Sequence, residues 1–388
     1  MDAIEHRYPH IKFERMWDST PSLYYMLGEC NSLIKAITNT AIRPEYLKSL
    51  HSIALNKGAQ ATTAIEGNTL TIEDIEKIQQ GNKLPPSKQY LQIEVENILE
   101  AFNTILKKVI INKETILINA ELIKYFHKMV GKNLGEHFQA IPGRFRTTNV
   151  IVGSYKAPEH QDVESLIDNL CIWLRKEFHF EKNQSFIEAV LQSIITHIYI
   201  AWIHPFSDGN GRTARLLEFY LLLRAGVPDI ASHVLSNFYN ITRSEYYRQI
   251  ENATNKRDMT EFISYAIQGF RDGLDEVLET IQENQLLITW RNYIYWIFEN
   301  KMTVGKTRQA NKRRRNLVLE IPYDKYLSAD EILNYKAWIV KEYASLSARS
   351  FQRDLDDIIE LGLLEKNKDG YRAKIEVLKK FMALQLSK

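Results

Sequence analysis

The stretch His204-Pro-Phe-Ser-Asp208-Gly-Asn-Gly-Arg212-Thr-Ala-Arg215 decides how the rest of the sequence is interpreted. Gly209 and Gly211 allow a backbone in which successive N–H groups face one concavity. A helix that begins near Arg212 adds unpaired N–H groups and the positive end of its dipole. Arg212 and Arg215 are three residues apart, so one helical face presents both guanidinium groups to the same anion. The stretch therefore predicts a phosphate-binding site.

His204 and Asp208 suit the chemistry of such a site. A carboxylate oxygen is a ligand that Mg²⁺ or Mn²⁺ accepts where the ion bridges phosphates. The pKa of a histidine lies near neutrality, so His204 is a candidate base for a hydroxyl nucleophile. Each residue type alone is more often structural, and His197 is expected to pack or hydrogen-bond within its helix. The contiguous arrangement nevertheless favours phosphate chemistry.

The stretch resembles the defining motif of the Fic family, His-x-Phe-x-Asp/Glu-Gly-Asn-Gly-Arg-x-x-Arg, at every specified position. The resemblance implies transfer of AMP from ATP to a Ser, Thr or Tyr hydroxyl of a target protein or of the chain itself. It also implies that His204 deprotonates the hydroxyl, that Asp208 holds the metal, and that Phe206 anchors the loop. Nucleotide phosphates are then expected at Gly209, Asn210, Gly211, Arg212, Thr213 and Arg215.

Two further segments resemble parts of the same family. Residues 143–154 resemble the flap, a β-hairpin that holds the target segment by backbone pairing, and the β-branched run 149–153 predicts its strand. The resemblance implies nucleotide contacts from Val152, Gly153, Ser154 and Tyr155. The segment that begins at Ser244 resembles the lining of the adenosine pocket, with contacts from Tyr246, Tyr247 and Asn255. Tyrosines at helical spacing also occur in cores, so that alternative stays open.

A third segment, Thr62-Thr-Ala-Ile-Glu66-Gly67, resembles the family's inhibitory pattern Ser/Thr-x-x-x-Glu-Gly/Asn. Its place before the core implies the subclass that carries its inhibitory helix in the same chain. Glu66 would pair with Arg215 in place of the γ-phosphate, so that ATP binds with its α-phosphorus wrongly aimed for in-line attack. We therefore expect a weak resting activity. A related hypothesis is that Glu66 also positions the water that removes AMP from modified targets.

Helical periodicity dominates the chain, and we expect a mainly α fold. Apolar residues recur at three- and four-residue spacing over 91–106, 166–178, 186–202 and 212–223. Thr71-Ile-Glu-Asp74 predicts a capping box that opens a helix to about Gln80. We expect an N-terminal helical region with the inhibitory motif at 1–85, a Fic core at 86–280 and a C-terminal unit at 281–388.

The composition changes near residue 280. Lys and Arg number 30 against 34 Asp and Glu over 1–280, but 20 against 14 over 281–388, with basic clusters at 301–308 and 312–315. A helix from Ser347 closed by Gly362, followed by a hairpin around Gly370, predicts a winged helix. One interpretation is DNA binding, with phosphate contacts from Arg313–Arg315 and groove contacts from Arg349, Gln352 and Arg353. Asp354, Asp356, Asp357 and Glu360 on the same helix favour the alternative, a protein-docking or regulatory module.

The remaining expectations follow from bulk properties. Two distant cysteines in 388 residues argue against a disulfide scaffold or a zinc site. We expect no signal peptide, because residues 1–9 lack a basic start and an apolar stretch, and no membrane span, because the apolar window 189–206 is too polar. The protein is therefore expected in the cytoplasm. A phosphate transferase of the same fold, a nucleotide-sensing transcription regulator and a homodimer stay open.

Overall fold

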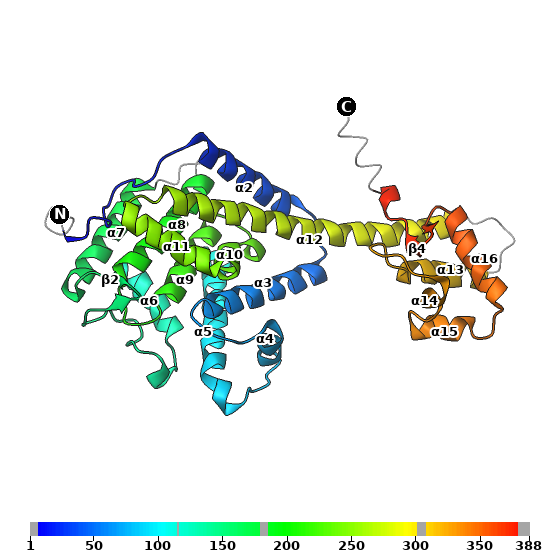
Figure 1. Cartoon of the computed structure of the whole chain (residues 1–388), viewed down its shortest axis with the longest axis horizontal. Coiled ribbons are helices and arrows are strands. Elements are labelled where there is room, and N and C mark those ends of the chain that lie inside the picture. Colours follow the sequence, from blue (N-terminus) through cyan, green and yellow to red (C-terminus); the bar gives the residue numbers. More distant parts are fainter. Residues whose placement is uncertain (1–6, 115, 179–184, 301–307, 379–388) are drawn as a thin grey trace. The chain divides into compact units, whose positions relative to one another are not determined.

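The structure is a computed structural model, and it describes residues 7–114, 116–178, 185–300 and 308–378. Over these residues the fold is mainly α, as predicted. The chain divides into two compact units, Met1–Glu279 and Thr280–Lys388, which are described separately. Figure 1 traces the elements of both units.

Two apolar helices form the centre of the first unit. They are α8 (Ser185–Ile203) and α9 (Asn210–Arg224), which pack along each other and are joined by residues 204–209. The window Phe186–Ile203 is long and apolar enough to cross a membrane by composition, yet 78% of it is buried inside the protein. A helix that is apolar on all sides is typically a core helix of a large domain. This pair therefore fixes the loop that carries the motif.

The other helices of the first unit surround this pair (Figure 1). The helices predicted at 91–106, 166–178, 186–202 and 212–223 are confirmed within three residues at each end. The longer helices are α2 (Pro21–Asn39), α5 (Gln89–Leu106), α6 (Ala120–Val130), α7 (Val163–Glu177), α10 (Val234–Ile241), α11 (Arg243–Lys256) and α12 (Thr260–Asn300), whose last part lies in the second unit. Short helical turns lie at Pro86–Lys88, Lys107–Ile111, Gly135–His137, His160–Asp162 and Asp229–Ala231.

The N-terminal helices pack on the rest of the first unit. Helix α3 (Pro44–Ala64) contacts α5, α9 and α10, and so brings the segment that follows it to the centre of the unit. The predicted capping box before α4 (Ile72–Gln79) is confirmed. The Asp74 backbone N–H donates to the Thr71 hydroxyl (3.2 Å), and the Thr71 N–H donates to the Asp74 carboxylate (3.4 Å).

The strand predicted over 149–153 is shorter than expected. Strand β1 (Ile151–Val152) pairs antiparallel with β2 (Tyr155–Lys156), and Gly153 turns the chain with φ +59°. Asn149 does not join the ladder, because its side-chain oxygen accepts the backbone N–H of His160 (2.8 Å). The result is a small hairpin on a helical body.

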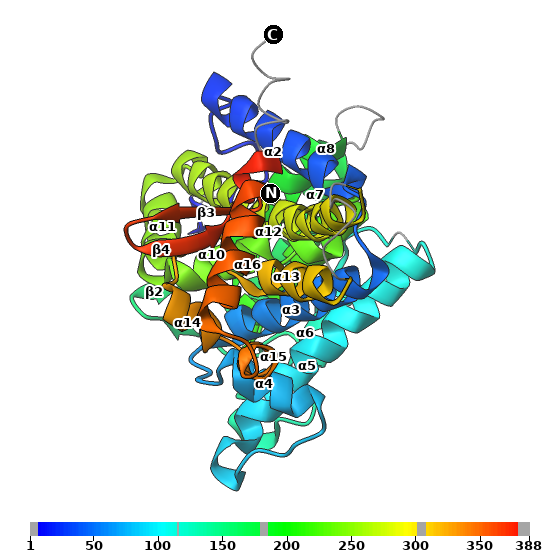
Figure 2. The same ribbon diagram turned by 90° about the vertical axis from the view of Figure 1, so that its right-hand side faces the viewer.

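The second unit combines short helices with one hairpin. Its described elements after α12 are α13 (Arg308–Glu320), α14 (Ala329–Leu333), α15 (Ala337–Tyr343), α16 (Ala348–Glu360), β3 (Leu364–Asn367) and β4 (Gly370–Ala373). The strands β3 and β4 lie side by side in Figure 2, and α16 packs on β3. Ser347 caps α16, and Gly362 follows it with φ +73°, as predicted. The assignment as a winged helix stays a prediction.

The phosphate contacts that the DNA-binding interpretation gives to Arg313–Arg315 would compete with ion pairs that Arg313 and Arg314 already make. Both pair with Asp354, a fully buried carboxylate, at 2.8 Å and 2.6 Å. Arg315 lies over the ring of Tyr295, 4.4 Å from its centre. A count of charges along the sequence could not show this, because Asp354 lies about forty residues further on. Residues 301–307 of the other basic cluster lie outside the described residues.

Candidate active site

The loop between α8 and α9 is held in shape by its own side chains. His204 follows α8 with φ +49°, a left-handed conformation that is costly for a residue with a side chain. Asn210 brackets Phe206, because its side chain accepts the Phe206 N–H (2.9 Å) and donates to the Phe206 carbonyl (2.8 Å). Phe206 is fully buried, as an anchor of the loop should be.

His127 of α6 also supports this loop, and no local sequence pattern predicts its role. Its ring stacks on Phe206 with 3.6 Å between ring centres. Nδ1 accepts the Gly143 N–H (2.9 Å), so Nε2–H donates to the Asp208 carbonyl (2.9 Å). Burial lowers the pKa of His127 to about 4, so this neutral tautomer persists at neutral pH.

The first turn of α9 has backbone geometry that fits the predicted anion site. Gly209 caps the helix with φ +78°, and a Cβ there would lie 2.9 Å from the Phe138 ring. No side chain caps the first turn, so its N–H groups face the site. A Cβ on Gly211 would lie 2.1 Å from Oε1 of Glu66, so that carboxylate lies directly over the glycine.

Glu66 pairs with Arg215 across 149 residues of sequence. Arg215 Nη2 donates to Glu66 Oε1 (2.5 Å) and to the Thr62 carbonyl (2.9 Å). Although burial acts to raise the pKa of Glu66, the adjacent Arg215 outweighs it and holds that pKa below its usual range. Arg215 is only 1% exposed, and its Nε and Nη1 have no partner among the described residues. A buried cation with spare donors is well suited to bind phosphate oxygens.

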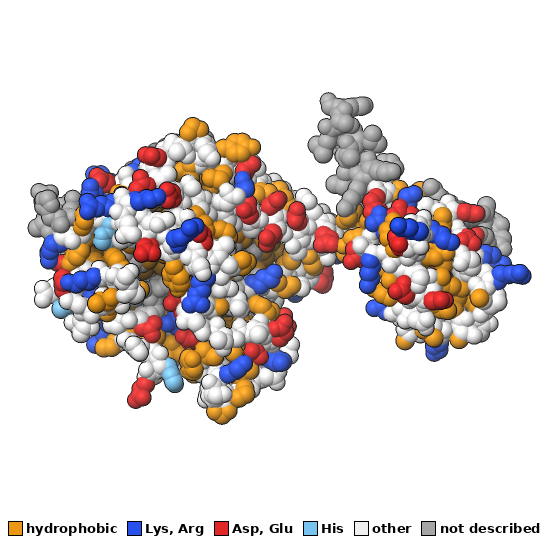
Figure 3. Space-filling model, viewed as in Figure 1, with side chains coloured by type: hydrophobic (Ala, Val, Ile, Leu, Met, Phe, Trp, Pro, Cys, Tyr) orange, Lys and Arg blue, Asp and Glu red, His pale blue; other side chains and the backbone are white. Residues whose placement is uncertain are grey.

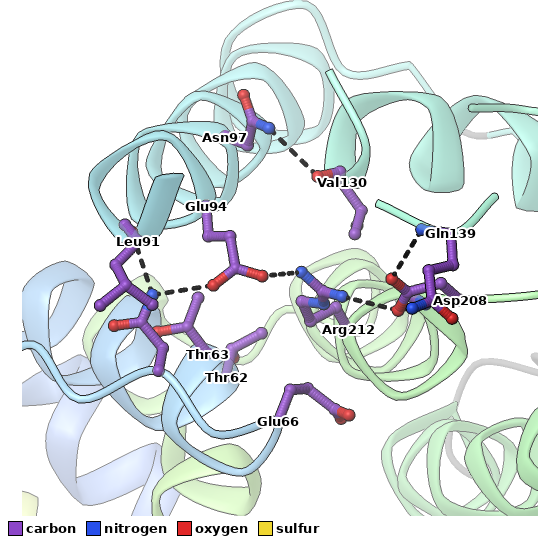
Figure 4. Close-up of polar contacts among 12 residues, drawn as sticks. Thr62, Thr63, Glu66, Leu91, Glu94, Asn97, Val130, Gln139, Asp208 and Arg212 are labelled. Atoms are coloured by element: carbon purple, nitrogen blue, oxygen red, sulfur yellow. Dashed lines mark hydrogen bonds and ion pairs between the residues drawn. The ribbon is translucent and has the colours of Figure 1, made fainter. Parts of the chain in front are cut away.

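Arg212 is held by a second carboxylate that the sequence analysis missed. Figure 4 shows Glu94 reaching from α5 to Arg212, and Arg212 reaching Asp208. The distances are 2.5 Å from Nη1 to Glu94 Oε1 and 2.9 Å from Nη2 to Asp208 Oδ1. The other Glu94 oxygen accepts Asn68 Nδ2 (3.0 Å), two residues beyond Glu66. Both arginines of the motif are thus paired with acids from the N-terminal half of the first unit.

His204 is the candidate proton acceptor of the site. Burial lowers its pKa, and Arg146 acts in the same direction, while the Ala201 carbonyl, Glu66 and Asp208 oppose the change. A lowered pKa keeps the imidazole neutral at pH 7, so it can take a proton.

The site also has one carboxylate suited to a metal. The Asp208 side chain is 29% exposed, and among the described residues its Oδ2 accepts only a long N–H contact from Gln139 (3.3 Å). Within the described ranges, no group of three or more His, Cys, Asp or Glu side chains could hold a metal ion. The residues therefore fit an ion held by one carboxylate together with phosphate oxygens, which is how Mg²⁺ is commonly bound.

Some predicted phosphate contacts would have to come from the backbone. The side chain of Asn210 is used on Phe206, and the Thr213 hydroxyl donates to the Gly209 carbonyl (2.9 Å). On the hairpin, Val152, Gly153 and Ser154 are exposed. Tyr155 is turned inward, and its hydroxyl donates to the Trp202 carbonyl (2.8 Å) at the end of α8.

Of the residues predicted for an adenosine pocket, Tyr246 and Tyr247 lie together, with 5.1 Å between their ring centres, and they differ in exposure. Tyr246 is buried in the core and its hydroxyl bonds to Nε2 of His197 (2.7 Å). Tyr247 is 47% exposed, and its hydroxyl donates to the Ile65 carbonyl (3.2 Å) beside the inhibitory segment. Asn255 is exposed near the end of α11. Of the three, only Tyr247 both reaches the inhibitory segment and stays accessible.

Comparison with known proteins agrees with this geometry. The pattern of the Fic/DOC family matches residues 117–222. The chain is 31% identical over 218 residues to a protein adenylyltransferase Fic of Nematostella vectensis, covering 56% of this chain and 47% of that protein. It is 30% identical over 232 residues to protein adenylyltransferase fic-1 of Caenorhabditis elegans, covering 58% and 43%. The chain thus spans less than half the length of these curated relatives.

Solved structures show the same fold. A Fic family protein from Desulfovibrio desulfuricans has a TM-score of 0.57 at 20% identity, covering 93% of this chain and 98% of that one. Fic-1 from C. elegans has a TM-score of 0.56 at 25% identity, covering 68% and 73%. The sequence match, the fold and the loop geometry agree, and this chain carries a domain of the Fic/DOC family over residues 117–222.

Proposed function

We propose that this protein transfers AMP from ATP to a hydroxyl side chain of a protein, and that Glu66 restrains the reaction. The observation that carries this proposal is the Glu66 carboxylate over Gly211 and 2.5 Å from Arg215. A carboxylate in that place is an anion bound where a phosphate would bind. The curated relatives named protein adenylyltransferase support the chemistry.

The residues of the site divide the reaction between them. The first turn of α9 and Arg215 bind the phosphates of ATP and orient the α-phosphorus. Neutral His204 takes the proton of the target hydroxyl as its oxygen bonds to that phosphorus. The bond to the bridging oxygen breaks, and pyrophosphate leaves with the electron pair. Asp208 would hold Mg²⁺ or Mn²⁺, which supplies positive charge for the phosphates. Glu66 competes with the nucleotide for Arg215, so the resting enzyme is weak.

A pair of experiments with ATP labelled at different phosphorus atoms tests this proposal against phosphate transfer. The Glu66→Gly variant is incubated with ATP labelled either at the α-phosphorus or at the γ-phosphorus, in a lysate as the source of targets. Adenylyl transfer puts only the α label on protein, whereas phosphoryl transfer puts on only the γ label. Glu66→Gly/His204→Ala is the control, and only protein-bound label above its level, which includes the γ label from kinases of the lysate, is counted. Protein-bound γ label, or no label from the single variant, would exclude the proposed reaction.

Removal of AMP from modified targets is a second activity of the same site. It is supported by the pairing of Glu66, an acid able to orient water, with an arginine of the phosphate site. Release of AMP from a labelled target by the wild-type protein, lost in Glu66→Gln, is the expected result.

The second unit is better suited to docking a protein than to binding DNA. Arg313 and Arg314 are used on Asp354, and Gln352 bonds to Tyr371 (3.1 Å). In Figure 3 the Lys and Arg side chains visible on this unit are interspersed with Asp and Glu. DNA-binding surfaces usually gather positive charge on one face. Retardation of random duplex DNA that weakens with salt would reverse this preference. The labelling experiment also reports the target protein and any self-modification.

A further inference from the structure

Arg146 is a buried arginine whose described partners are all backbone carbonyls. It is 5% exposed, and its guanidinium donates to three segments of the chain. Nε donates to the His204 carbonyl (2.8 Å), Nη1 to the Thr148 carbonyl (2.9 Å) and Nη2 to the Pro158 carbonyl. Its own backbone N–H donates to the Pro205 carbonyl (2.9 Å). No ion pair neutralises it within the part of the chain that the structure describes.

These four hydrogen bonds join the two parts that must meet in catalysis. Thr148 and Pro158 lie on either side of the β1–β2 hairpin, and His204 and Pro205 begin the loop with the candidate base. His204 has φ +49°, a conformation that persists only where its surroundings fix it. The carbonyl that Arg146 binds belongs to this same residue. The guanidinium therefore fixes the unfavourable backbone conformation of His204 and the base of the hairpin together.

We propose that Arg146 is a positioning residue that holds the flap hairpin and His204 in one arrangement, so that a hydroxyl presented by the flap meets the base. The proposal rests on the proposed adenylyl transfer only for its effect on rate. The arrangement itself is a property of the fold. A planar guanidinium spans three carbonyls in fixed directions, which the single ammonium of a lysine cannot do. Arg146→Lys therefore keeps the charge and loses the geometry, whereas Arg146→Met loses both.

Hydrogen exchange followed by mass spectrometry tests the arrangement without any activity. Amides of the hairpin, residues 147–158, and of the loop, residues 203–209, should exchange faster together in Arg146→Lys than in the wild-type protein. Arg175→Lys, an exposed arginine of α7, is the matched control and should change neither peptide. Unchanged exchange in the loop would overturn the proposal, whatever the outcome for adenylyl transfer.

Kinetics in the Glu66→Gly background separate positioning from nucleotide binding. Arg146→Lys should lower kcat roughly ten- to a hundredfold, because small displacements of a base are costly, and leave KM for ATP within about twofold. The charged groups that act on His204 are Arg146, Glu66 and Asp208, and Arg146 lowers its pKa. The acidic limb of the pH profile should therefore move to higher pH in Arg146→Met but not in Arg146→Lys. A raised KM for ATP with an unchanged kcat, or equal pH profiles in both variants, would contradict the proposal.

Discussion

Replacing Glu66 by Gln isolates the charge that restrains the site. The amide keeps the shape of the side chain and one hydrogen bond from Arg215, but it removes the attraction between opposite charges. A hydrogen bond to a charged partner contributes about 1.5–3 kcal/mol. The Glu66 side chain is 31% exposed, so solvent screens it and the lower end applies. About 1.5 kcal/mol corresponds to roughly a tenfold higher rate of AMP transfer.

The assay for this prediction is the initial rate of AMP incorporation across a range of ATP concentrations. Because the restrained site is expected to bind ATP in the wrong orientation, the gain should appear mainly in kcat. Glu76→Gln, on the exposed side of α4, changes the charge equally and should leave the rate as it was. If Glu66→Gln stays within twofold of both the wild-type protein and Glu76→Gln, the restraint does not reside in this ion pair.

Glu94→Gln in the Glu66→Gly background removes a carboxylate that competes for Arg212, so KM for ATP should fall about fivefold; an unchanged or higher KM in a titration of ATP would show that Glu94 does not compete. Burial lowers the pKa of His233 from 6.5 to about 3, so the folded state resists a proton that the unfolded state accepts. The free energy of unfolding is therefore highest above pH 6.5 and falls as the pH drops towards 3. The free energy of unfolding should fall by about 2 kcal/mol by pH 5. Urea unfolding at pH 7 and 5 should therefore show a smaller decrease for His233→Phe than for the wild-type protein, and equal decreases would refute the role of His233. Asp354→Asn removes the buried carboxylate that Arg313 and Arg314 share and leaves Arg314 with Asp357 alone (2.5 Å), and urea unfolding followed by tryptophan fluorescence should show a loss of about 3 kcal/mol in the second unit. An unmoved midpoint would mean that the ion cluster is not needed.

The parts of the fold that depend on neighbouring residues could be predicted from the sequence. The capping box at Thr71 and the turn after α16 at Gly362 each involve residues within a few positions of one another. The same holds for α8 and α9, whose apolar pattern is continuous. The motif between them was sufficient to predict the local backbone geometry, a glycine with positive φ that opens a helix carrying both arginines, because these residues act within one turn and one helix.

The residues that support the site could not be predicted, because their partners are distant in sequence. Arg146 meets His204 across 58 residues, and Glu94 meets Arg212 across 118. Neither carries a local pattern that distinguishes it from a surface charge. The same reason explains why the ion pair of Arg314 could not be predicted, because its partner Asp354 is buried and lies 40 residues further along the chain. Tyr246 was predicted for the adenosine pocket with the core as an alternative, and only its bond to His197 in the structure shows that it lies in the core.

Tandem mass spectrometry of proteins exposed to the Glu66→Gly variant and ATP tests both AMP transfer and its restraint by Glu66. We expect peptides that carry one AMP on the side-chain oxygen of a serine, threonine or tyrosine. The same peptides should be unmodified with Glu66→Gly/His204→Ala, and much less modified with the wild-type protein. Modified peptides that are equally abundant for the wild-type protein and Glu66→Gly would contradict the restraint by Glu66. Peptides that carry phosphate in place of AMP would contradict the proposed reaction itself.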